Sequence, residues 1–121
     1  QESLITLKAA NNYAASLVDL QSFEEAKQLL RKIMAIARRV LGDRHRLTLK
    51  MRWTFATALC RADGATLDDV REAVATLVET ERTARRVLGG AHPLTSGIEN
   101  NLLLARAALR ARETPSSPGS A

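Results

Sequence analysis

Asparagine, tryptophan and lysine side chains recur at matching positions along the chain and are the residues best suited to noncovalent binding. Asn11, Trp53 and Asn100 are separated by intervals of 42 and 47 residues, and Lys8 and Lys50 each stand three residues before the first two. An asparagine amide carries paired donors and acceptors that can hold an extended peptide backbone, and a lysine attracts acidic side chains. These residues therefore predict recognition of a peptide.

The histidines, the single cysteine and the glycine pair of the sequence do not form a pattern typical of a catalytic or metal-binding site. His45 and His92 lie in matching segments without a serine or cysteine partner in a plausible triad, so loop packing or capping explains them better than catalysis. Cys60 is the single cysteine, which excludes an internal disulfide framework and predicts a small buried or groove residue. Gly89 and Gly90 follow an expected helix instead of a strand, which fails the requirement of a phosphate loop. We expect no enzymatic activity, no metal and no cofactor.

A twelve-residue segment that occurs twice sets the organisation of the chain. Residues 37–48, Ala-Arg-Arg-Val-Leu-Gly-Asp-Arg-His-Arg-Leu-Thr, return at 84–95 with nine of twelve positions identical. Each copy contains the basic end of a helix, a glycine stop, a short loop and the threonine that opens the next helix. Self-similarity over forty-odd residues is typical of helical repeat arrays. The segment is therefore the joint between repeats.

Hydrophobic periodicity predicts an all-α chain of five helices. Apolar residues recur at three- and four-residue steps through most of the sequence, and aromatic residues make up only 3% of it. Ser22 followed by Glu25 indicates a capping box, and Pro93 suits the first turn of a helix. The expected helices cover about residues 3–20, 23–41, 47–62, 67–88 and 93–112; residues 1–112 form the helical domain, and 113–121 are expected to be a disordered tail or linker.

Charge and hydropathy narrow the class of partner. The net charge is +5 with a pI near 10.1, which favours acidic partners, although a basic solvated surface also serves solubility. Every hydrophobic run is interrupted by charged residues, so we expect no membrane partner. The lone cysteine favours a reducing, cytoplasmic location. The sequence begins at Gln1 without a signal-peptide pattern, and we interpret it as a piece of a longer protein.

Five short motifs connect the repeat with a known family. They are Thr6-Leu7, Asn11-Asn12-Tyr13-Ala14, Phe23-Glu24-Glu25-Ala26, Val40-Leu41-Gly42 and His92-Pro93-Leu94-Thr95. This pattern resembles the 42-residue tetratricopeptide repeat of kinesin light chains over about residues 4–112, roughly two and a half repeats. The resemblance implies a tetratricopeptide-like α-α superhelix of five antiparallel helices, right-handed, whose first, third and fifth helices line a concave groove. Such grooves bind a peptide segment or a partner helix.

The resemblance also places the binding residues on the groove face. Asn11 and Asn100 are expected to contact peptide backbone, as the groove asparagines of this motif do in the family. Trp53 either fills the core or is a binding hot spot, and Asn12 and Asn101 either share the asparagine role or satisfy backbone groups. The predicted groove residues are Lys8, Asn11, Asp19, Lys50, Trp53, Thr57, Arg61, Asn100 and Leu104.

Two alternatives stay open beside an interaction scaffold. The first is a basic module for nucleic acid, a less favoured partner than protein, because part of the basic run complements the helix dipole. The second is self-association: the last helix lacks a pairing helix, so another copy would cover its face of Leu102, Leu103 and Leu109. The basic run consists of Arg38, Arg39, Arg44, Arg46, Lys50 and Arg52, with Asp43 among them.

Overall fold

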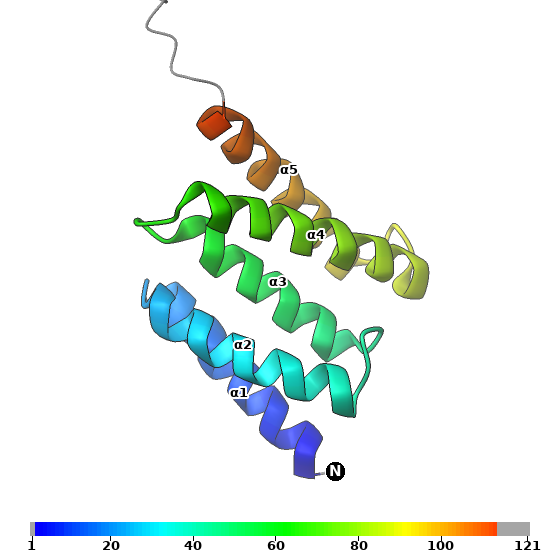
Figure 1. The fold of residues 1–121 in the computed structure, drawn as a ribbon. Helices are drawn as coiled ribbons and strands as arrows, with labels where there is room; N and C mark the ends of the chain where they lie inside the picture. Colours follow the sequence, from blue (N-terminus) through cyan, green and yellow to red (C-terminus); the bar gives the residue numbers. More distant parts are fainter. Residues whose placement is uncertain (1, 114–121) are drawn as a thin grey trace, which may run out of the picture.

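The computed structural model describes the backbone of residues 2–113, with side chains from Leu4 onward, and consists over that range of five α-helices (Figure 1). This confirms the all-α prediction. Glu113, which the sequence placed in the tail, is the last residue of the fifth helix, and the rest of that predicted tail, 114–121, lies outside the described residues. The helices are α1 Glu2–Asp19, α2 Phe23–Val40, α3 Arg46–Arg61, α4 Leu67–Leu88 and α5 Pro93–Glu113.

Consecutive helices run in alternate directions and pack side by side from α1 to α5 (Figure 1). The odd-numbered helices also contact one another, α1 against α3 and α3 against α5. Over residues 2–113 the backbones of α2 and α4 make no such contact. The odd helices therefore form a closely packed inner layer, and the even helices lie farther apart on the outside.

Small residues allow the close approach of neighbouring helices. Ala14 and Ala56 on odd helices, and Ala26 and Ala73 on even helices, are all fully buried at equivalent positions of the two repeats. Larger apolar side chains fill the space between the layers, and burying each contributes about 1.5–3 kcal/mol relative to exposure. The largest of them are Phe55, Leu30, Leu49, Met51, Leu59, Leu77 and Ile98.

The duplicated segment forms two similar joints, each with a glycine stop and a histidine that accepts a backbone hydrogen bond. Gly42 and Gly89 take φ values of 93° and 91°, a region that favours glycine, and end α2 and α4. His45 Nδ1 accepts a hydrogen bond from the Leu47 N–H at 3.0 Å. The N–H of Leu94 donates to His92 Nδ1 at 3.0 Å in the second joint. Of the two roles expected for the histidines, loop packing or capping, both joints show capping.

The capping box predicted at the start of α2 is wrong. Ser22 occupies the N-cap position with ψ 64°, outside the extended conformation that aims a side chain at the first turn, and makes no capping hydrogen bond. The Glu25 carboxylate instead accepts from the Tyr13 hydroxyl at 3.4 Å. A capping box begins α4: Thr66 N–H donates to Asp69 Oδ2 at 3.0 Å, and Asp69 N–H donates to Thr66 Oγ1 at 3.1 Å.

The exposed apolar face of α5 differs from the predicted one. Leu102 is buried in the core and Leu109 is partly buried, so the expected face of Leu102, Leu103 and Leu109 is wrong in two of its members. Leu103 and Leu104 are 61% and 70% exposed. Leu102 turns inward because it lies one helical turn from buried Ile98. Within residues 2–113, no helix combines the length and apolar character needed to cross a membrane.

Candidate functional site

A groove of about 350 Å³ runs across the inner layer, and all three odd helices contribute to it. On α1 and α3 the lining residues are adjacent or three to four positions apart, so they share one face. We call it the central groove. It is lined by Ala15, Val18 and Asp19 from α1, by Trp53, Thr54, Thr57 and Arg61 from α3, and by Asn101 from α5.

Trp53 is placed between the core and the groove, and its role as a binding hot spot stays a prediction. Its side chain is partly buried against the core and also lines the central groove. The indole lies against α5 at Gly97: a Cβ at that glycine would be 2.4 Å from Trp53 Cη2. No alanine fits there without displacing the ring. This contact accounts for a glycine in the middle of a helix, and it fixes the indole at the wall of the groove.

The polar groups of the central groove are partly used within their own helices. Thr54 Oγ1 donates to the Lys50 carbonyl at 2.9 Å and Thr57 Oγ1 donates to the Trp53 carbonyl at 3.0 Å. Asn101 Nδ2 donates to the Gly97 carbonyl at 3.1 Å, which matches the backbone-satisfying interpretation of this amide. With their protons engaged, the two threonines offer a ligand only hydroxyl lone pairs.

Charges of opposite sign lie at one end of the central groove. Asp19 ends α1 and Arg61 ends α3, and both line the groove. The Arg61 guanidinium lies 5.9 Å from the centre of the Phe23 ring, so a cation–π contact holds it over α2. Among the described side chains, residues 4–113, no carboxylate pairs with Arg61 and no cation pairs with Asp19. Both groups are therefore available to a ligand.

A second hollow of about 230 Å³ carries only positive charge among its ionised groups. Lys8 and Ala15 are seven residues apart, as are Lys50 and Thr57, so this basic hollow continues the face of the central groove toward the joint. No carboxylate among the described side chains of residues 4–113 pairs with its three cations. The basic hollow is lined by Leu4, Lys8, His45, Arg46, Leu47 and Lys50.

A third hollow of about 130 Å³ lies between α3 and α5 and shares Thr57, Arg61 and Asn101 with the central groove. It is mainly apolar and includes the exposed Leu104. Cys60 is partly buried there, and desolvation raises the pKa of its thiol despite the nearby Arg112. The thiol therefore stays protonated at neutral pH and contributes apolar surface to the hollow instead of a nucleophile.

Two predicted groove residues are not where the sequence placed them. Asn11 is only 7% exposed, and its Oδ1 is buried without a hydrogen-bond partner, because α1 and α3 pack against each other at this level. Asn100 is exposed but lies outside the hollows, since it stands two residues from buried Ile98 and from buried Leu102 and so projects from the opposite side of α5. Its neighbour Asn101 lines the groove instead.

The other predicted residues lie together on the inner face. Sequence reasoning missed Thr54 and left the role of Asn101 open. The signal that could have found both is the Asn-Asn pair, whose second position is Asn101 on α5 and Thr54 on α3. Lys8 and Lys50 line the basic hollow, Asp19, Trp53, Thr57 and Arg61 the central groove, and Leu104 the third hollow.

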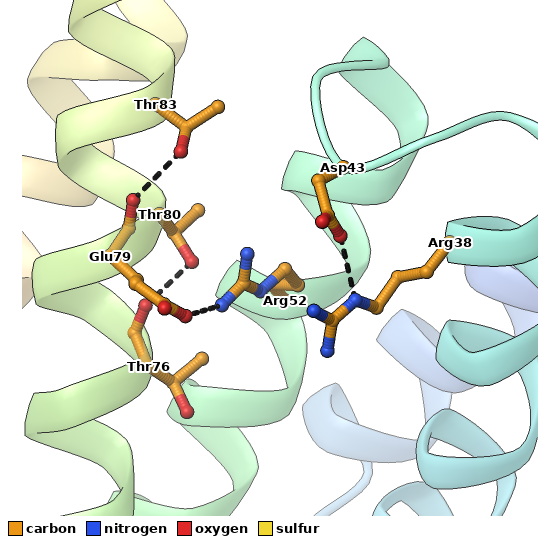
Figure 2. A network of polar contacts seen from close by, with 7 residues as sticks. All are labelled: Arg38, Asp43, Arg52, Thr76, Glu79, Thr80 and Thr83. Carbon is orange, nitrogen blue, oxygen red and sulfur yellow. Dashed lines mark hydrogen bonds and ion pairs between the residues drawn. The ribbon is translucent and has the colours of Figure 1, made fainter.

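The basic run does not act as one positive surface. Arg38 Nε donates to Asp43 Oδ1 at 2.6 Å, and Arg52 is buried, with an 8% exposed side chain whose guanidinium pairs with Glu79 of α4 (Figure 2). Figure 2 also shows Thr80 and Thr83 donating to carbonyls of α4. Two cations of the run are therefore neutralised by carboxylates, one of them inside the fold.

Comparison with known proteins identifies a family. A family model described as tetratricopeptide repeat matches residues 5–67, just over half of the chain, from α1 through α3 to the first residue of α4. No curated protein and no solved structure matches the chain. The matched region contains the first repeat, both lysines of the basic hollow and Trp53.

Proposed function

We propose that the inner face of the protein binds an extended segment of a partner protein. The chain belongs to the tetratricopeptide repeat family, whose members are non-catalytic scaffolds for protein–protein interaction. The observation that carries the proposal is the lining of one groove by three helices around a partly exposed Trp53. A rigid aromatic wall beside Asp19, Arg61 and Asn101 combines apolar contact with polar groups that fix orientation.

The charge of the inner face favours an acidic ligand. Lys8, Arg46 and Lys50 surround the basic hollow without carboxylate partners among the described side chains of residues 4–113. They attract negative charge and raise the association rate at low salt. We infer a segment that places an acidic residue in the basic hollow and an apolar residue against Trp53. The pairing of Arg38 and Arg52 with carboxylates favours this ligand over nucleic acid.

The finer assignment follows the sequence motifs. Thr6-Leu7, Asn11-Asn12 and the Leu-Gly-x-x-His-Pro joint at Leu88 support a kinesin-light-chain type of repeat. We propose that this chain acts as a scaffold in the cytoplasm. The closing alanines of the first repeat, Ala14 and Ala26, are buried as such a hairpin requires.

Peptide binding tests the function directly. Acidic, neutral and basic peptides of equal length, each with one leucine, are titrated into the protein and followed by calorimetry and by the fluorescence of the single tryptophan. We expect the acidic peptide to bind most tightly, and Lys8→Glu with Lys50→Glu to weaken it at least about ten-fold, equivalent to about 1.4 kcal/mol. Lys32→Glu, on the outward side of α2, removes a lysine at an exposed position and serves as the matched control.

Two further variants separate binding from folding. Trp53→Phe keeps an aromatic ring at the groove wall, whereas Trp53→Ala removes it and its packing on Gly97. We expect the affinity for the peptide to fall from wild type to Trp53→Phe and further to Trp53→Ala. The helicity measured by circular dichroism should be retained at least in Trp53→Phe. Equal affinity of the lysine variants and wild type for the acidic peptide, or binding of a DNA duplex with a steeper salt dependence than any peptide, would overturn the proposal.

A further inference from the structure

The fifth helix carries apolar residues on two opposite sides. One side enters the core through Ile98, Leu102 and Ala105. The other presents Leu103 and Leu104, with Ala107 exposed one turn later. A helix that is apolar on opposite faces buries both when its partners are complete. We call the surface of Asn100, Leu103, Leu104, Ala107 and Ala111 the outer face of α5; all five residues are exposed.

The outer face is not shaped like the corresponding surface of the earlier repeats. Leu103 occupies the position of Ala14 and Ala56, which are fully buried. Ala56 and Leu77 of α4 line one hollow, so we infer that the second helix of a hairpin approaches the first at this position. A leucine there holds a following helix away from that approach, because a larger side chain overpacks a seam built for a methyl group. The outer face therefore suits a different partner from another hairpin helix of this repeat.

We propose that the outer face binds the outer face of a second copy, with the two α5 helices antiparallel about a two-fold axis. In the register centred between Ala105 and Arg106, Leu104 of each copy lies opposite Ala107 of the other, and Asn100 lies opposite Ala111. Each Leu104 and each Asn100 then faces an alanine of the other copy, which favours close packing of the two helices. The same patch serves both copies, as an isologous dimer requires.

Charge complementarity selects the antiparallel orientation. Glu99 and Arg110 flank the outer face on the same side and are 11 residues apart, about 16 Å along a helix that rises about 1.5 Å per residue. In the antiparallel pair Glu99 of one copy approaches Arg110 of the other, and the contact occurs twice. In a parallel pair Glu99 and Arg110 would stay about 16 Å apart along the helix axes, so this contact could not form. Glu99 is about half exposed while bound to Arg85, so it can accept a further donor.

The dimer gives the protein two connected binding surfaces. Leu104 lines the third hollow of the inner face and also belongs to the outer face of α5. The two inner faces therefore meet near the two-fold axis, where one partner with two recognition segments can engage both. Linked segments bind with an avidity that exceeds either affinity. The dimer itself does not depend on the identity of the ligand.

The oligomeric state tests the proposal on the full chain. Sedimentation equilibrium over a wide concentration range is expected to show a monomer–dimer equilibrium. Leu103→Glu with Leu104→Glu should raise the dimer dissociation constant at least about ten-fold without loss of helicity. Leu20→Glu replaces a leucine that is 75% exposed at the end of α1 and is the matched control, which should dimerise like wild type. A monomer at every concentration, or equal dimerisation of all three proteins, would overturn the proposal.

Two substitutions test the register. In a Cys60→Ser background, Leu104→Cys and Ala107→Cys proteins are mixed under oxidising conditions; a heterodimeric disulfide should form faster than with Leu20→Cys, because it needs Cα atoms within about 7 Å. Glu99→Arg should weaken the dimer, and Glu99→Arg with Arg110→Glu should restore it. Two results together would refute the two-fold pair and show a head-to-tail stack. They are assemblies larger than a dimer and a disulfide between the Leu104→Cys and Leu20→Cys proteins.

Discussion

The Trp53 indole packs so closely on the backbone of Gly97 that a methyl group at Gly97 would lie 2.4 Å from Cη2. Alanine normally stabilises a helix interior by about 1 kcal/mol relative to glycine, but overpacking a filled site costs about 1–3 kcal/mol. Gly97→Ala should therefore lower the free energy of unfolding in the wild-type protein. In a Trp53→Ala background the same change should raise it. Urea denaturation of wild type, the two single variants and the double variant measures both changes in the free energy of unfolding. If the effects of the two substitutions simply add, the contact is contradicted.

The His92 imidazole should be replaceable at its joint only by another side chain that accepts a hydrogen bond. His92→Ala removes the acceptor for the Leu94 N–H and should cost about 0.5–2 kcal/mol, as loss of an N-cap does. His92→Asn offers a carboxamide oxygen in the same place and should recover most of the loss. Thermal denaturation of both variants checks this order. Equal losses for alanine and asparagine would show that the imidazole acts through packing instead.

The capping box of α4 should make stability sensitive to acid. Hydrogen bonds from Thr66, the backbone N–H first, lower the pKa of the Asp69 carboxyl below its ordinary value of 3.8. A folded-state pKa below the unfolded one means that the stabilisation is present above about pH 4 and is lost as the pH falls through the folded value. The melting temperature of Asp69→Ala should fall below that of wild type at pH 7, and the two should converge toward pH 2. A difference that is constant with pH would exclude the carboxylate as its source.

The Arg52–Glu79 pair should respond unequally to removal of either partner. Glu79→Ala leaves a buried guanidinium without its carboxylate and should destabilise the fold by about 1–3 kcal/mol, less than for a fully buried pair because Glu79 itself is largely exposed. Arg52→Met replaces the buried charge by an apolar side chain of similar length and should be nearly neutral. In the Arg52→Met background, Glu79→Ala should then lower the free energy of unfolding only slightly. Chemical denaturation of the four proteins measures this coupling.

The helix boundaries could be predicted from the sequence because local chemistry determines them. Gly42 and Gly89 stop helices by their φ values, and apolar spacing defines the faces between them. The capping box failed at Ser22 because residue types indicate which groups can bond but not the backbone angle that aims them. Thr66 and Asp69 show the same spacing and do form the box. Local signals thus predict where helices begin and end better than which hydrogen bonds close them.

The binding face could be predicted only in part. Trp53 and Arg61 line the groove as expected, because helical period alone brings them to one side of α3. The burial of Asn11 depends on how closely α1 approaches α3, which no local pattern specifies. The exchange of Asn100 for Asn101 depends on the rotation of α5, which the packing of Trp53 on Gly97 helps to set. Tertiary packing therefore decides which of two adjacent amides a ligand meets.

Among the described residues, one ion pair joins the outer helices α2 and α4, and it bears on how the array can bend. Arg31 of α2 donates to both carboxylate oxygens of Glu72 in α4 at 3.3 Å, with its guanidinium 4.8 Å from the centre of the Phe55 ring. Flattening the array would pull apart the apolar contacts of the odd helices, whereas curling it further would compress those contacts and stretch this exposed, salt-sensitive ion pair. The curvature of the array is therefore opposed in both directions, by apolar packing between the inner helices and by one ion pair between the outer ones.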